Sequence, residues 1–238
     1  MARLPRLIVP HQPHHIVQQG NDRQPIFREP EDYQRFLGWL RDSAREYKVA
    51  IHAYVLMPTQ LQLLATPSDA EGLAQTMQRV GRYYVPWYNA KYARTGSLFQ
   101  GRFKTSVIDA AAYLLQCSLY IEQAPVRAGL AGLAGEALAY PWSSHAHHAG
   151  VSPDAVITDH ALYWALGNTP FQREAQYKQL AERSLTGAQL EAIDKAVLKG
   201  WPLGSVAFKA SLEKKAQRQV LPAKRGRPFK VKPPAPAN

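Results

Sequence analysis

The stretch AIHAYVLMPTQLQLLAT, residues 50–66, constrains the fold more than any other part of this chain. It contains two apolar segments, 51–57 and 61–65, that are too short for helices and rich in β-branched, aromatic and other apolar residues. Pro58-Thr59 between them favours a turn, because proline has no N–H to donate to a strand ladder. We therefore expect an antiparallel pair of strands.

The second of these strands carries two glutamines among apolar residues. The two-residue period of a strand places Gln60 and Gln62 on one face and Leu61 and Leu63 on the other. Because an unpaired amide is costly to bury, such a pair in a buried sheet needs a partner or a function. Gln60 and Gln62 are therefore candidate site residues.

The flanking sequence predicts the rest of a small sheet. A first strand is expected over 15–19, and part of 98–108 forms another, as judged from apolar content and the bounding turn residues. Helical periodicity predicts helices over 31–47, from Ser68-Asp69 to about Trp87, and over 110–123, with a kink or break at Pro86. The order β-α-β-β-α-β-α predicts an α+β fold, a ferredoxin-like antiparallel sheet with helices on one face.

The C-terminal part has a different character. We expect a first domain over 1–150, a helical extension over 151–220 and a disordered basic tail over 221–238, where Pro, Lys and Arg dominate. Three helices are predicted in the extension, starting after the capping residues Thr169, Thr186 and Ser205. A tight turn between the last two allows either a helix-turn-helix that reads DNA or a helical hairpin that packs on the first domain.

Charge and cysteine content limit the partners and the compartment. The formal net charge is +11, and residues 209–232 hold nine Lys or Arg against one acid, which favours a nucleic acid before a membrane surface. The single cysteine, Cys117, excludes an internal disulfide and a multi-cysteine zinc site. No apolar run has the length of a membrane span and no signal peptide is evident, so a cytoplasmic, nucleoid-associated location is expected.

Five segments together resemble a known family. They are HHIVQQGNDR at 14–23, AYVLMP at 53–58, GSLFQGRFK at 96–104, YLLQCSLYIEQAPVRAG at 113–129 and PWSSHAHHAG at 141–150. In order and spacing they resemble the REP-associated tyrosine transposases, single-tyrosine members of the HUH superfamily of single-stranded-DNA transposases. The resemblance covers about residues 5–150, and residues 170–230 are more loosely similar to the C-terminal region of longer members.

The resemblance implies a chemistry and shows where this chain departs from it. In the family, a pair of histidines holds a divalent metal, Mg²⁺ or Mn²⁺, that polarises the scissile phosphate, and a helix-borne tyrosine attacks it. The tyrosine matches Tyr120, but the histidine positions fall on Gln60 and Gln62, and an asparagine position falls on Ala124. Because all three ligand positions are altered, we expect a protein that binds hairpin or repeat DNA with impaired or lost strand cleavage. The alternative is an active transposase.

Basic residues indicate where DNA would bind. Arg102 and Lys104 flank Phe103 in a segment where the family contacts DNA, and such alternation suits phosphate pairing with base stacking. Arg23 and Arg127 extend this surface. In the tail, Lys224-Arg225-Gly226-Arg227-Pro228 resembles an AT-hook core for a narrow minor groove, with a generic basic tail as the alternative. An RNA-binding ferredoxin-like module is a further reading, and the oligomeric state stays open.

Several other side chains have simpler interpretations. His52 is expected to be a hydrogen-bonded structural histidine rather than a substitute ligand. Glu122 lies two residues after Tyr120 and should point to another side of its helix. The HAHH segment contains three histidines, His145, His147 and His148. We expect them to form a solvated surface, because no acid lies near them in the sequence.

Overall fold

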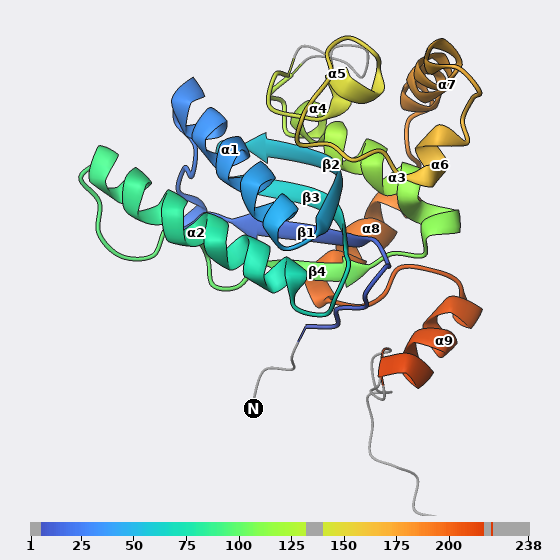
Figure 1. Ribbon diagram of the computed structural model, residues 1–238, viewed down its shortest axis with the longest axis horizontal. Coiled ribbons are helices and arrows are strands. Elements are labelled where there is room, and N and C mark those ends of the chain that lie inside the picture. Colours follow the sequence, from blue (N-terminus) through green and yellow to red (C-terminus); the bar gives the residue numbers. More distant parts are fainter. Residues whose placement is uncertain (1–5, 132–139, 217–219, 221–238) are drawn as a thin grey trace, which may run out of the picture.

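Four antiparallel strands form the centre of the computed structural model, which describes residues 6–131, 140–216 and 220. Their order across the sheet is β2-β3-β1-β4, the ferredoxin-like order (Figure 1). Their bounds are β1 His14–Gln19, β2 Val49–Met57, β3 Gln60–Pro67 and β4 Lys104–Val107. The predicted α+β antiparallel sheet is confirmed, and the β2–β3 hairpin turns at Pro58-Thr59 as expected.

Two long helices cover one face of the sheet. They are α1 (Pro30–Glu46) and α2 (Gly72–Lys91), and they pack on the Leu61 and Leu63 side of β3. Among the aromatic side chains of this layer, Tyr84 donates a hydrogen bond to the carbonyl oxygen of Ile26. Each buried aromatic of this kind removes a large apolar area from water, so this layer is the main hydrophobic core.

Helix α2 continues through Pro86 to Lys91, so the predicted break at the proline does not occur. Proline leaves the carbonyl of the residue four positions earlier, Arg82, without its helical donor. Both Pro86 and Arg82 are exposed, so water can satisfy that carbonyl. The next turn is held in place by Tyr88, whose hydroxyl donates to the carbonyl of Pro25 at 2.7 Å.

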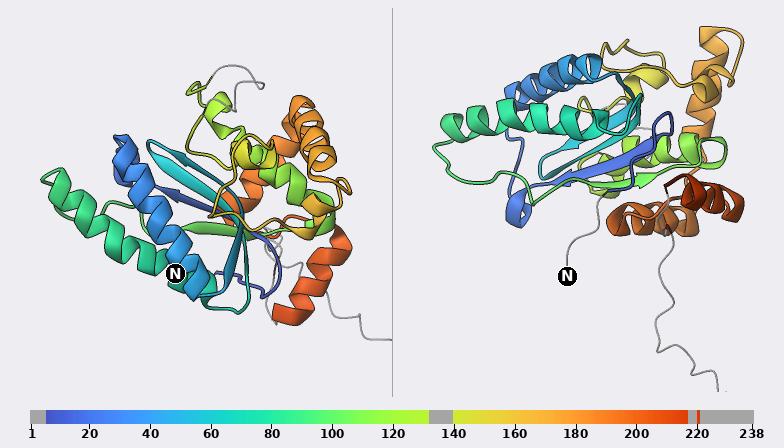
Figure 2. Two further views of the ribbon diagram at one scale, coloured as in Figure 1. Left: turned by 45° about the horizontal axis from the view of Figure 1, so that its top comes forward. Right: turned by 60° about the horizontal axis from the view of Figure 1, so that its bottom comes forward.

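A second helical layer covers the opposite face. It consists of α3 (Ala110–Glu122) and α8 (Gly187–Lys199), and the edge-on view in Figure 2 (right) shows the sheet between the two layers. The expectation of helices on one face therefore holds for α1 and α2 but not for α3. The physical reason is that Val55 of β2 and Leu64 of β3 point to this second face, and they need an apolar cover.

The remaining helices are short or C-terminal. Their bounds are η1 Asn21–Arg23, α4 Ala124–Arg127, α5 His145–His148, α6 Ala161–Trp164, α7 Pro170–Glu182 and α9 Val206–Ala216. The predicted capping residues are confirmed: Thr169 and Thr186 form capping boxes, and Ser205 accepts the N–H of Phe208 at 3.1 Å.

The C-terminal extension packs on the sheet through α8. Ile193, Ala196 and Val197 of this helix are buried in the second core. Within the described ranges, no helix has both the length and the apolar character that crossing a bilayer requires. The tail residues proposed as an AT-hook core lie outside the described residues: Lys224, Arg225 and Arg227.

Helix α8 itself offers a matched test of this packing. Ile193→Ala removes a side chain that is 1% exposed and should lower the free energy of unfolding by about 2–4 kcal/mol, because it leaves a cavity. Leu198→Ala, on the same helix but 50% exposed, should cost less than about 1 kcal/mol. Urea unfolding of both variants measures the difference, and equal effects would show that α8 does not pack as described.

Candidate functional site

The strand register brings the candidate glutamines onto the face covered by α3 and α8. Val17 of β1 lies directly between Gln62 of β3 and Lys104 of β4, and His15 lies between Leu64 and Ser106. Directly opposed residues in an antiparallel sheet share a face. The same side of the sheet therefore carries the side chains of Gln62, His15 and Lys104. The row of Gln62 and Lys104 lies two residues along the strands from the row of Leu64, which the helices cover.

Both glutamine amides already have hydrogen-bond partners on β1. The Nε2 atom of His15 lies 2.9 Å from Oε1 of Gln62, and Nε2 of Gln19 donates to Oε1 of Gln60 at 3.3 Å. Burial lowers the pKa of His15 to about 4, so the ring is neutral at pH 7 and its Nε2–H donates to Gln62. These bonds offset the cost of burying amides in an apolar sheet.

Tyr120 projects from α3 toward this row and is held on three sides. Its hydroxyl donates to the carboxylate of Asp194 on α8, and its ring meets the His15 ring edge-on at 5.6 Å between centroids. The guanidinium of Arg127 lies 4.2 Å from the centre of the Tyr120 ring and donates to the Tyr120 carbonyl. Only 6% of Tyr120 is exposed. The Tyr120 hydroxyl therefore faces α8 and is engaged by Asp194.

The surroundings keep Tyr120 in its protonated form. Burial raises the pKa of Tyr120, and the hydrogen bond and charge of Asp194 raise it further, against a weaker opposing effect of Arg127. The Asp194 carboxylate is placed to accept the phenol proton, as a general base would be. The tyrosine therefore has a proton acceptor but no environment that favours the phenolate.

The ligand positions do not fit a Mg²⁺ or Mn²⁺ ion. These ions need several oxygen ligands in near-octahedral geometry, yet the matched positions offer only two neutral amide oxygens, each of which already accepts one hydrogen bond within the sheet. Ala124 is buried and offers no donor atom.

A groove opens beside this face where the cover of α3 and α8 ends. It has a volume of about 330 Å³, and its lining includes Val17, Gln19, Arg102 and Lys104. Arg102 is exposed and Lys104 is half-buried. The predicted pair of basic residues therefore borders an open groove next to Gln62, with exposed Arg23 on the loop that follows β1.

The expectation that Phe103 stacks on bases is wrong. Phe103 is 7% exposed, belongs to the α1–α2 core, and carries the guanidinium of Arg6 at 3.7 Å from its ring centre. The alternation that turns Arg102 and Lys104 outward turns Phe103 into the core. Arg127 likewise has a partner, because it contacts Tyr120.

The histidines of α5 are not a solvated surface, which corrects the sequence interpretation. His145 and His148 are buried, and their Nδ1 atoms lie 3.0 and 2.6 Å from the two carboxylate oxygens of Glu122. Ser144 and Tyr177 also donate to this carboxylate, at 2.5 and 2.7 Å. The acid comes from α3, more than twenty residues earlier in the chain, so no local pattern reveals it.

Glu122 points away from Tyr120, as its position two residues later predicted. Burial alone would raise the pKa of Glu122, but the charge of His148 and the hydrogen bonds from His145 and His148 outweigh it and hold that pKa well below its usual range. The ionised carboxylate thus joins α3 to α5 and, through Tyr177, to α7. It is a buried structural centre separate from the Tyr120 site.

Comparison with known proteins supports the family resemblance. Residues 9–124 match the family described as IS200-like transposases. This part of the chain is therefore similar to the IS200-like transposases. A REP-associated tyrosine transposase bound to a REP hairpin has the same fold, with a TM-score of 0.51, 15% identity, and 67% of this chain and 92% of that chain covered. The resemblance to tyrosine transposases predicted from the sequence is confirmed.

A Deinococcus radiodurans protein assigned as a transposase is also similar to this chain. The match has 18% identity and a TM-score of 0.32, and it covers 48% of this chain and 93% of that chain. No curated protein sequence matches the chain.

Sequence reasoning missed two residues of the candidate site. His15 faces Gln62 because of the pairing of β1 with β3, and a two-residue period alone does not give that register. Asp194 reaches Tyr120 from a helix 74 residues later in the chain. Nothing local to α8 signals this contact.

His52 is a structural histidine, as expected, and its titration provides a test. Its Nδ1 lies 2.7 Å from the Thr158 carbonyl and its Nε2 2.8 Å from the Thr66 hydroxyl, and burial lowers its pKa to about 4. Its folded pKa is below its unfolded value of about 6.5, so its contribution to stability is present above pH 6.5 and is lost as the pH falls toward 4.

The variant His52→Gln should therefore flatten the pH dependence of stability. Between about pH 4.5 and 6, the slope of the unfolding free energy against pH should fall by about 1.4 kcal/mol per pH unit, one proton's worth. Urea unfolding across this range measures it, with exposed His11→Gln as the control that keeps the wild-type slope. Identical slopes for wild type and His52→Gln would contradict the burial of a neutral His52.

Proposed function

We propose that this chain is a transposase-family protein that binds single-stranded, hairpin or repeat DNA and that its strand-cleavage activity is impaired or lost. The groove beside Gln62, with Arg102 and Lys104 at its border, offers positive charge for a phosphate backbone. The formal net charge of +11 favours a polyanionic partner. The neighbour of the same fold is a transposase bound to a REP hairpin, which supports the choice of DNA over RNA.

One observation carries the proposed loss of cleavage. The two amide oxygens at the family's histidine positions, on Gln60 and Gln62, already accept hydrogen bonds from Gln19 and His15. Transposases of this type depend on a metal ion, and here an ion would find only two neutral amide oxygens, each sharing its lone pairs with a hydrogen-bond donor, and no help from Ala124. A buried polar group that loses its partner costs about 1–3 kcal/mol, which works against metal binding.

The second candidate is an active enzyme, which the position of Tyr120 favours. In that case the Tyr120 oxygen would attack the scissile phosphorus of single-stranded DNA and Asp194 would accept the phenol proton. The 3′-oxygen would leave, and a 5′-phosphotyrosine would remain. Mg²⁺ or Mn²⁺ would be its cofactor. Either candidate would act on DNA in the cytoplasm and associate with the nucleoid.

The two candidates differ in the formation of a covalent DNA adduct. Hairpin-bearing single-stranded oligonucleotides, incubated with the wild type and either Mg²⁺ or Mn²⁺, should give no adduct on a denaturing gel. The triple variant Gln60→His, Gln62→His, Ala124→Asn restores the donor types that the family uses and should give an adduct if Tyr120 remains reactive.

The control for this assay is Tyr120→Phe in both backgrounds, which keeps the ring that packs on His15 and removes the nucleophile. A wild-type adduct that disappears in Tyr120→Phe would overturn the proposed loss of cleavage. Retained hairpin binding without adducts in any variant would leave a DNA-binding protein whose site lost more than its metal ligands.

The basic residues of the groove should carry part of the binding. The double variant Arg102→Ala, Lys104→Ala should weaken hairpin binding about tenfold or more in 0.1 M salt, and the slope of log K against log salt should fall by about 1.5. Fluorescence anisotropy with a labelled hairpin measures both quantities. An RNA hairpin of the same sequence serves as competitor, and preferential binding of RNA would favour the RNA-binding alternative.

A charge-matched control exists on the other side of the sheet. Arg35 and Arg45 of α1 are both exposed and belong to the layer opposite to the groove. The double variant Arg35→Ala, Arg45→Ala removes the same net charge and should change affinity much less. Equal losses in the two double variants would mean that binding follows net charge alone, not the groove.

A further inference from the structure

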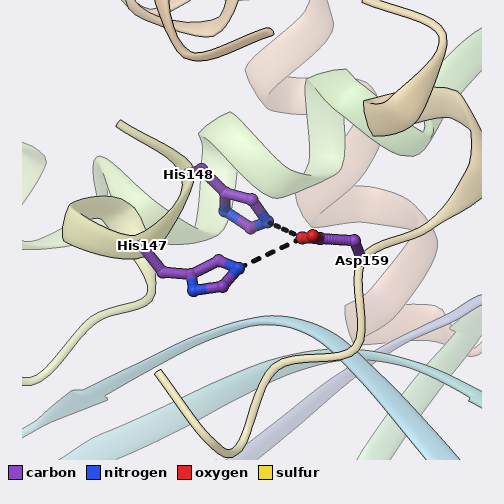
Figure 3. A group of neighbouring side chains, drawn as sticks. All are labelled: His147, His148 and Asp159. Atoms are coloured by element: carbon purple, nitrogen blue, oxygen red, sulfur yellow. Dashed lines mark hydrogen bonds and ion pairs between the residues drawn. The ribbon is translucent and has the colours of Figure 1, made fainter. Parts of the chain in front are cut away.

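Three metal-ligating side chains meet outside the Tyr120 site. His147 and His148 come from α5 and Asp159 from the segment before α6, and Figure 3 shows the two imidazole rings turned toward the carboxylate. The Nε2 atoms of His147 and His148 lie 3.1 and 3.9 Å from Oδ1 of Asp159. All three ligand atoms lie within 4.8 Å of one another.

These separations match those around a tetrahedral zinc ion. Zn–N and Zn–O bonds of about 2.0–2.1 Å at tetrahedral angles place neighbouring ligand atoms about 3.3 Å apart. The two distances to Asp159 bracket this value and no ligand atom lies more than 4.8 Å from another, so the side chains would draw together to surround one ion. Two imidazoles with one carboxylate form a donor set that suits Zn²⁺ and related transition ions better than Mg²⁺.

The orientation of His148 is set by a group behind it. Its Nδ1–H donates to the buried, ionised carboxylate of Glu122 at 2.6 Å, which leaves Nε2 as the nitrogen that faces Asp159 and can bind an ion. A carboxylate on the second nitrogen of a ligating histidine is the usual outer partner in metal sites, where it orients the ring and makes it a stronger donor. Glu122 is itself fixed by three further donors: His145, Ser144 and Tyr177.

His147 supplies the more adaptable ligand. Its Nδ1 accepts the backbone N–H of Asp154 at 3.0 Å, so in the metal-free protein the Nε2 proton points to Asp159. A cation at Nε2 takes the place of this proton, which moves to Nδ1, and the N–H of Asp154 gives up its bond there. Metal binding therefore exchanges two local hydrogen bonds for three coordinate bonds.

The position is reached from solvent on one side. The side chain of His148 is 3% exposed, whereas those of His147 and Asp159 are 19% and 20% exposed. Protein ligands thus approach from the buried side, and water can complete a four-coordinate ion from the open side.

We propose that His147, His148 and Asp159 form a binding site for a divalent transition-metal ion of the Zn²⁺ class. The ion joins α5 to the segment before α6 and, through Glu122, to the helix that carries Tyr120. This site is independent of the family's catalytic metal position, since Glu122 and Tyr120 lie on different sides of α3.

The test uses the full chain without a histidine tag, stripped with a chelator and titrated with ZnCl₂ by calorimetry. We expect one ion per chain, and a loss of affinity of at least thirtyfold in His147→Ala and in Asp159→Asn. Neither change touches the Glu122 hydrogen bonds, so both variants should fold. His11→Ala, which removes an exposed histidine elsewhere, should bind as the wild type does.

Cobalt provides an independent readout of the ligands. Co²⁺ bound to the wild type should give the intense visible absorption of four-coordinate cobalt, and Asp159→Asn and His147→Ala should lose it. Zinc binding that is unchanged in both variants, or no stoichiometric binding below about 100 μM, would overturn the proposal. None of these measurements involves DNA, so the outcome is separate from that of the proposed function.

Discussion

The central sheet is apolar on both faces, and the need to cover both determines the rest of the molecule. Helices α1 and α2 bury the face that carries Leu61 and Leu63. The opposite face, with Val55 and Leu64, needs a second layer, which α3 and α8 provide. Because burial of apolar surface is the dominant favourable term in folding, the C-terminal extension is part of the core rather than an appendage.

This second layer also sets the state of the candidate site. Helix α3 carries Tyr120 over His15, and α8 brings Asp194 to the tyrosine hydroxyl. At the margin of the covered region the polar side chains pair with one another: Gln62 with His15, and Gln60 with Gln19. A site whose amides and phenol are all hydrogen-bonded is stable, and its stability works against metal binding and nucleophilic attack.

Local patterns predicted much of the fold. The two-residue period of β3, the capping boxes at Thr169 and Thr186 and the turn at Pro58-Thr59 each depend on residues a few positions apart. Non-local pairings were beyond such patterns. The contacts of Glu122 with α5 and of Asp194 with Tyr120 join residues 22 to 74 positions apart, so they depend on how helices pack.

The same distinction explains which site residues were predicted. Gln60 and Gln62 were found from the two-residue period of their strand, and the register confirms that they share a face, whereas a family resemblance supplied the position of Tyr120. The HAHH histidines were misread because their acidic partners, Glu122 and Asp159, come from other parts of the chain. Phe103 was misjudged because the sequence interpretation did not apply the alternation of β4 and the segment before it. That alternation turns the Phe103 side chain into the core.

The central claim is that the oxygens of Gln60 and Gln62 remain bonded within the sheet and hold no divalent ion. The most direct test is a crystal structure of the protein with a DNA hairpin, grown in MnCl₂ and measured at the manganese absorption edge. Our account predicts no anomalous peak between Gln60, Gln62 and Tyr120, with the His15–Gln62 hydrogen bond intact. A manganese peak bonded to both amide oxygens would contradict it.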